Sequence, residues 1–257
     1  MSSPMRRLLL TLSGFLALSC AGFMPVQADT TPPSPKPDGA WVTPFQAFAL
    51  DGTVPLFTGE YTVERKGGLM REIQIYRDPE GRVAHRVESL YDEMNHRPVF
   101  YESQDFTNGV AAVVQVRPSG LDYEIRDAQG NVTRSGHQDA SKSTYLWPNL
   151  VQLVDEDWDN VITGKDLDVD LFFASLNTSV SVQVAKDGKA DVNGTPGEQF
   201  KVVASSALVR LFMKPIRLVF STDGSHRLLT FEGRSVVSDR NRNNLDLRIV
   251  FGARKAG

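Results

Sequence analysis

From about residue 57 onward, short runs of alternating or β-branched apolar residues are separated by Gly, Pro, Asn and Asp every 8–12 residues or so. This spacing is typical of antiparallel strands joined by tight turns. The clearest pair is 70–77 and 82–90, on either side of Asp78-Pro79-Glu80-Gly81, a typical hairpin turn. Further strands are predicted at 60–66, 98–104, 110–117, 121–126, 132–135, 166–174, 178–186, 199–205, 217–221, 227–238 and 245–251.

The alternation gives way to a helical pattern once, between residues 147 and 164. Pro148 suits a first helical turn, and an acidic face formed by residues 155–157 and 159 lies opposite an apolar stripe. The stripe consists of Leu150, Val151, Val154, Trp158 and Val161. One amphipathic helix over 147–164 is therefore predicted, and a second, short helix is predicted over 206–213.

About 10–12 strands with one substantial helix predict an α+β fold, because a sheet of that size must curl and its apolar face needs a cover. The preferred architecture is a strongly curved antiparallel half-barrel, with the helix packed into its concave side. A closed lipocalin-like β-barrel is the alternative.

The beginning of the chain predicts export. Arg6 and Arg7 precede a mostly apolar stretch at 8–18, and small residues before Asp29 suit cleavage after Ala28, so residues 1–28 are read as a signal peptide. Two alternatives are a lipoprotein anchored through Cys20 and an uncleaved anchor helix. Residues 29–45 follow as a Pro-rich linker, and 46–257 are assigned to a single β-rich domain without a spanning helix in the mature chain.

Composition excludes several classes of protein. The chain has 257 residues with 28 Lys+Arg against 31 Asp+Glu, which gives no electrostatic footprint for nucleic acid. Its one cysteine, Cys20, excludes an internal disulfide, a four-cysteine zinc site and a CxxC redox centre. The expected compartment is the periplasm.

No catalytic, cofactor-binding or metal-binding residues are predicted. The histidines are His85, His96, His137 and His226, and no two have the spacing that presents a metal site on a helix. The acidic run at 155–160 resembles the start of a calcium loop, but Asn160 stands where glycine is needed and the apolar helical spacing continues through the run. The sequence thus favours a protein that is not an enzyme. A hydrolase using paired carboxylates is the least favoured reading.

The apolar residues of the later strands exceed what one thin sheet needs to cover a face. Part of that surface is therefore interpreted as a hydrophobic cleft with a helical lid. The candidate ligand-binding residues are Leu150, Val154, Trp158, Phe173, Val182, Phe220 and Phe231.

A strand meander, an amphipathic helix and more strands, in that order, resemble the periplasmic carriers and receptors of outer-membrane lipoproteins. The closing segments 213–220 (MKPIRLVF) and 227–233 (RLLTFEG) resemble the end of uncharacterised exported bacterial proteins of that fold. The resemblance implies a half-barrel that holds acyl chains under a helical lid. No functional residue of that family is assigned to a position in this sequence.

Together these features favour a non-enzymatic exported protein without a cofactor. Its concave sheet face is expected to bind a lipid, an acyl chain or the apolar segment of an envelope protein such as a lipoprotein. The alternative is a structural or interaction protein of the cell envelope that contacts a protein partner and has no small ligand.

Overall fold

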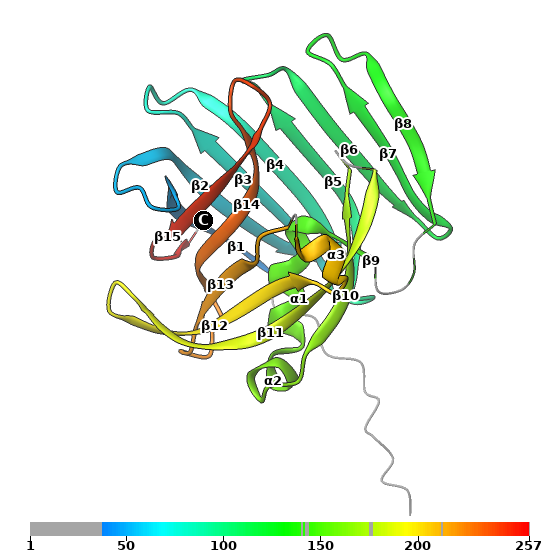
Figure 1. The fold of residues 1–257 in the computed structure, drawn as a ribbon. Coiled ribbons are helices and arrows are strands. Elements are labelled where there is room, and N and C mark those ends of the chain that lie inside the picture. Colours follow the sequence, from blue (N-terminus) through cyan, green and yellow to red (C-terminus); the bar gives the residue numbers. More distant parts are fainter. Residues whose placement is uncertain (1–37, 140, 142–143, 175–176, 212, 257) are drawn as a thin grey trace, which may run out of the picture. The chain divides into compact units, whose positions relative to one another are not determined.

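In the computed structural model, sixteen strands form one open sheet in the order β8-β7-β6-β5-β4-β3-β2-β1-β15-β14-β13-β12-β11-β10-β9, with β16 beside β1. The structure describes residues 38–256 except 140, 142–143, 175–176 and 212, and these belong to a single compact unit, Pro33–Gly257. β9 and β10 pair in parallel, whereas the strands before β9 and those after β10 in the sequence form antiparallel meanders. Figure 1 traces the sheet from β8 through β1 to β9.

The strands are β1 (Gly39–Ala49), β2 (Pro55–Lys66), β3 (Leu69–Arg77), β4 (Val83–Asp92), β5 (Arg97–Asp105), β6 (Val110–Arg117), β7 (Gly120–Arg126), β8 (Val132–Gln138), β9 (Thr144–Leu146), β10 (Leu167–Phe173), β11 (Thr178–Val192), β12 (Thr195–Ala204), β13 (Ile216–Ser221), β14 (Leu228–Ser238), β15 (Asn244–Phe251) and β16 (Lys255–Ala256). The helices are η1 (Trp147–Asn149), α1 (Leu150–Glu156), α2 (Trp158–Ile162) and α3 (Ala207–Arg210). Helices therefore form a small part of an almost entirely β architecture.

The sheet curls so strongly that its second half returns over the concave face of its first half (Figure 1). Leu146 of β9 and Phe172 of β10 pack in one cluster with β4–β7, and the rings of Phe172 and Tyr123 are 5.9 Å apart. Nevertheless the edge strands β8 and β9 do not pair with each other within the described residues. The fold is thus the predicted half-barrel and not the closed lipocalin-like alternative.

The helical prediction at 147–164 is right in place but wrong in continuity. The segment comprises η1, α1 and α2, and the helix breaks at Asp157, where φ is −100° and ψ is 20°. Asp and Asn favour local side-chain bonds over helix continuation, and Asn160 Nδ2 donates to Asp157 Oδ1 at the break. We call residues 147–162 the cover, because they lie against the concave face of the sheet.

The predicted count of about 10–12 strands is too low: the thirteen ranges named from the sequence all fall on strands of the sheet, and three further strands escape the sequence patterns. β9 and β16 have only three and two residues, too few to show a periodicity. β1 begins at Gly39, inside the segment expected to be linker up to residue 45. Residues 29–37 of that linker, the expected signal peptide over 1–28 and Cys20 lie outside the described residues.

Pro44 is accommodated in β1 by an interruption in the neighbouring strand. β1 pairs with β15 from Phe45 onward and with β16 at Trp41 and Val42. Between these two pairings the N–H of Gly252 donates to Pro44 O at 2.7 Å. At this interruption the neighbouring strand has no carbonyl that would need a hydrogen bond from an N–H of residue 44, so the N–H that proline lacks is not missed. A strand with an internal proline therefore occupies the middle of the sheet.

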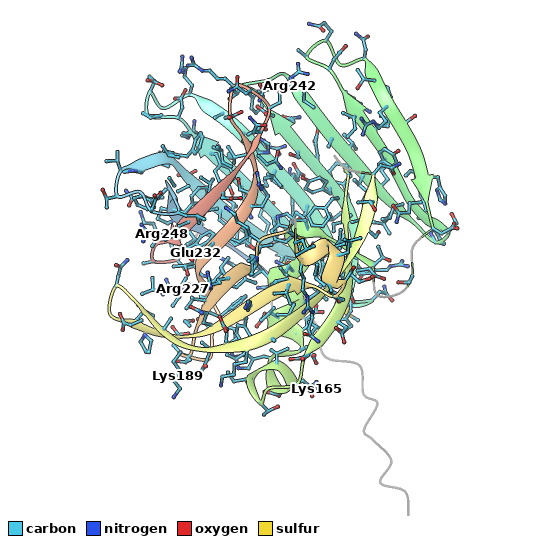
Figure 2. All side chains as sticks on the ribbon, in the orientation of Figure 1. Lys165, Lys189, Arg227, Glu232, Arg242 and Arg248 are labelled. Atoms are coloured by element: carbon cyan, nitrogen blue, oxygen red, sulfur yellow. The ribbon has the colours of Figure 1, made fainter. Side chains whose placement is uncertain are left out.

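The two faces of the sheet differ in chemistry. The concave face and the cover enclose the main apolar core, which draws on β1, β3 and β10–β15. The opposite face carries charged ladders, such as Arg71 Nε to Glu88 Oε1 at 2.7 Å and Arg234 Nε to Asp246 Oδ1 at 2.9 Å. Glu232 and Arg248, labelled in Figure 2, stand opposite each other in the register of β14 and β15.

Candidate ligand-binding site

The cover packs onto the concave face through one apolar side. Leu150, Leu153 and Val154 are buried in the main core. The Trp147 ring stacks on Phe173 with 5.8 Å between centroids and meets Phe231 edge-on at 5.9 Å. Because α1 has only seven residues, its stability comes from this packing; isolated helices shorter than about 12 residues are marginal in water.

A small cavity remains between the cover and the sheet, and we call it the lid cavity. Its volume is about 60 Å³. Apolar and aromatic side chains dominate its wall, among them Tyr76, Val87, Trp147, Leu150, Phe231 and Ile249. An apolar space of this kind favours hydrocarbon over water.

A much larger groove of about 790 Å³ opens beside the same cover. Trp41 and Val63 of the first sheet half line it, together with Arg65, Arg227 and Arg254. We call it the arginine groove. Val151 of α1 and Leu228 of β14 line both the arginine groove and the lid cavity, so these two side chains separate the polar space from the apolar one.

A buried polar cluster beneath α1 ties the cover to β2–β4. Glu72 is only 4% exposed and accepts hydrogen bonds from Tyr61 Oη, Gln152 Nε2 of α1 and, at 3.0 Å, Ser89 Oγ. Burial raises the pKa of Glu72 from 4.5 to about 7, although these donors and Arg65 act in the opposite direction. Glu72 therefore holds α1 with a carboxyl group that changes charge near neutral pH.

Two further polar contacts hold the cover from its sides. Glu156 Oε2 accepts from Tyr91 Oη at 2.9 Å and lies 3.0 Å from His96 Nδ1. On the other side Asp155 Oδ1 is 2.9 Å from His226 Nδ1, and the His226 ring stacks on Trp158 with 3.9 Å between centroids. The acidic side of the predicted helix thus serves as its attachment to the sheet and to the loop before β14.

The closed cover leaves buried polar atoms unsatisfied. Asn149 is fully buried, and neither its Oδ1 nor its Nδ2 has a hydrogen-bond partner among the described residues. Gln152 Oε1 is in the same state. Each such group costs about 1–3 kcal/mol, which lowers the stability of the closed arrangement relative to an opened one.

The seven residues predicted to bind ligand all belong to the cluster between sheet and cover. Leu150, Val154, Val182 and Phe220 are buried there, whereas Trp158, Phe173 and Phe231 are partly buried against it. Of the seven, Leu150 and Phe231 line the lid cavity and none lines the arginine groove. Their role in binding stays a prediction.

The sequence reading missed the polar part of the site. Glu72 alternates with Met70, Gln74 and Tyr76, and this inward register was a signal for a buried carboxyl group. Trp41 fell in the expected linker, and Arg254 follows the last predicted strand. The arginine groove joins these distant segments, so no local pattern could indicate it.

The remaining candidate residues form no metal site in the described part of the chain. There, no three His, Cys, Asp or Glu side chains are grouped to hold a metal ion. The acidic run at 155–160 forms the end of α1, the break at Asp157 and the start of α2. His85 is buried and contacts Ser103 Oγ at 2.9 Å, and its burial lowers its pKa to about 4.

Among the residues that the structure describes, no helix combines the length and apolar character needed to cross a membrane.

The comparisons yield solved structures of similar fold but no family. Neither a protein-family model nor a curated protein matches the chain. A beta-barrel-like protein of domain of unknown function DUF1849 from Brucella abortus is 9% identical, with a TM-score of 0.41, covering 86% of this chain and 98% of that one. A DUF1329 family protein from Desulfovibrio piger is 10% identical, with a TM-score of 0.28 and coverage of 89% and 87%.

A putative outer membrane lipoprotein-sorting protein domain from Vibrio parahaemolyticus is also similar. It is 6% identical, with a TM-score of 0.28, and the match covers 85% of each chain.

Proposed function

We propose that this chain is an exported, periplasmic, non-enzymatic protein that binds a hydrophobic ligand between the concave face of its sheet and its cover. The ligand class is a lipid, an acyl chain or the apolar segment of an envelope protein. The N-terminal pattern with Arg6 and Arg7 supports export, and the apolar concave face supports the ligand class.

The observation that carries the proposal is the apolar lid cavity beside a larger groove, with Val151 and Leu228 lining both. A ligand can enter through the groove and place its apolar part against the core. The lid cavity, at about 60 Å³, is smaller than a typical ligand site of roughly 300–1,000 Å³, so binding requires α1 to move outward.

Such a movement must break the apolar packing of Leu150, Leu153 and Val154, and two features of the cover lower its cost. The segment is short, and its closed position leaves the side-chain atoms of Asn149 and Gln152 Oε1 unsatisfied. Elements that move on ligand binding belong to the locally least stable parts of a fold. Hydrocarbon that replaces the side chains of the cover keeps the apolar surface of the sheet out of water, which is worth about 25 cal/mol per Å².

A displacement titration tests the proposal. The full chain is titrated with the neutral dye N-phenyl-1-naphthylamine, whose fluorescence rises in apolar surroundings, and the dye is then displaced with a 16-carbon fatty acid. We expect saturable binding with a stoichiometry near one and full displacement. A folded protein that neither binds the dye saturably nor carries lipid through purification from native membranes contradicts the proposal.

A further inference from the structure

Two of the three arginines that line the arginine groove have no carboxylate partner among the described residues. Arg65 is paired with Glu93, with 2.8 Å between Nε and Oε1. Arg227 Nη1 donates to the carbonyl of Gly252 at 2.9 Å, and neither Arg227 nor Arg254 forms an ion pair with a carboxylate of the described residues. Figure 2 labels Arg227 just before β14.

The two acids that line the groove, Asp38 and Asp155, contact other groups. Asp38 Oδ1 accepts from the N–H of Gly67 at 3.0 Å, and Asp155 Oδ1 pairs with His226 at 2.9 Å. The pKa of Arg254 is lowered first by burial and then by repulsion from Arg65 and Arg227, against attraction from Tyr61 and Asp155. Arg254 is therefore held among other cations in a partly desolvated place.

The Trp41 ring fixes the positions of two of these cations. The guanidinium carbon of Arg254 is 4.4 Å from the ring centroid, and that of Arg65 is 4.6 Å from it. Both contacts lie within the range of cation–π attraction. A guanidinium held in this way presents a planar fork of donors that suits the oxygens of a phosphate or carboxylate.

The groove also has an apolar exit. Its wall includes Val151 and Leu228, which line the lid cavity on their other side. A ligand with an anionic group among Arg227 and Arg254 and a hydrocarbon chain leading past these two side chains matches both spaces.

We propose that the arginine groove binds the anionic headgroup, a phosphate or carboxylate, of an amphiphile whose chain enters beneath the cover. The inference rests on the proposed function, because it assigns the polar end of that same ligand. Headgroup charge then contributes to selection, and an amphiphile of equal chain length without charge binds more weakly.

The test compares two probes that differ only in one phosphate: lysophosphatidic acid and the monoacylglycerol with the same chain. We expect the full chain to bind the phosphate probe at least about tenfold more tightly, and the preference to shrink as salt is raised. R227Q/R254Q loses the preference while its affinity for monoacylglycerol stays within about twofold. R227K/R254K keeps the charge and most of the preference.

The matched control is R97Q/R240Q, which removes two exposed arginines outside the groove and retains the full preference. Equal affinity of the unaltered chain for both probes overturns the headgroup assignment and leaves the proposed function standing. Failure of both probes to bind overturns the proposed function itself. Inorganic phosphate that binds as tightly as lysophosphatidic acid overturns the amphiphile, because the site then selects a free anion.

Discussion

Val151→Trp is expected to weaken the binding of a long-chain ligand about a hundredfold, which corresponds to ~3 kcal/mol. Val151 is one of the two side chains that line both the arginine groove and the lid cavity. An indole at this position therefore fills the passage that the hydrocarbon chain of the ligand must take. Overpacking a fitted space costs about 1–3 kcal/mol, and bound hydrocarbon would have to compete for the same volume. Displacement of the neutral dye by a 16-carbon fatty acid measures the effect.

Two variants serve as controls for this prediction. Val54→Trp adds the same indole at a site that is 73% exposed and lines neither space, and it should bind like the unaltered chain. Val151→Ala widens the passage and should bind at least as tightly. If the unfolding transition of Val151→Trp matches that of the unaltered chain and the variant still binds with unaltered affinity, the passage is not the route of the ligand.

Relative to the unaltered chain, Glu72→Gln is expected to gain about 3 kcal/mol of stability between pH 4.5 and pH 8. The pKa of Glu72 rises from 4.5 to about 7 on folding, and a pKa difference of one between the folded and unfolded states corresponds to about 1.4 kcal/mol. Between these two pKa values the folded state keeps a proton that the unfolded state releases. Its contribution to stability is therefore complete below pH 4.5 and is lost as pH rises through 7.

Urea unfolding across pH 4–8 measures this effect as the difference between Glu72→Gln and the unaltered chain. Burial lowers the pKa of His85 to about 4, so this residue makes the folded protein less stable as pH falls below 6.5. His85 is present in both proteins, however, and its effect cancels in the difference. A difference that stays flat with pH would contradict the assignment of Glu72.

Glu88→Gln is the matched control, from the charged face of the neighbouring strand. Burial acts to raise the pKa of Glu88, but Arg71 and Arg86 outweigh it and lower the pKa overall. Its charged form is therefore stabilising above its ordinary pKa, and this stability is lost as pH falls. Glu88→Gln should lower stability at pH 8, opposite in sign to Glu72→Gln.

The sequence predicted the meander well wherever a local pattern sets the structure. The strand predicted at 110–117 is β6 with the same bounds, and Asp78 to Gly81 form the turn between β3 and β4. It failed where a tertiary arrangement decides. β1 was hidden by neighbouring prolines, because only the interruption at Gly252 in the adjacent strand lets Pro44 sit there.

The candidate site divides along the same line. Helical spacing placed Leu150, Val154 and Trp158 on the side of the cover that meets the sheet. The arginine groove could not be predicted, because Arg65, Arg227 and Arg254 come from three distant segments, and isolated arginines look like solvated surface in a sequence. The curl of the sheet brings them together, and no local periodicity encodes it.

The most direct test of the central claim is to locate the hydrocarbon chain of a bound ligand by paramagnetic relaxation in the NMR spectrum of the full-length protein. Stearate with a nitroxide near its methyl end is compared with the same ligand after reduction of the nitroxide. The account predicts selective broadening of residues that line the lid cavity, such as Leu218, Phe231 and Ile249. Broadening confined to the outer face or to β8, with the signals of these three residues unchanged, would contradict binding beneath the cover.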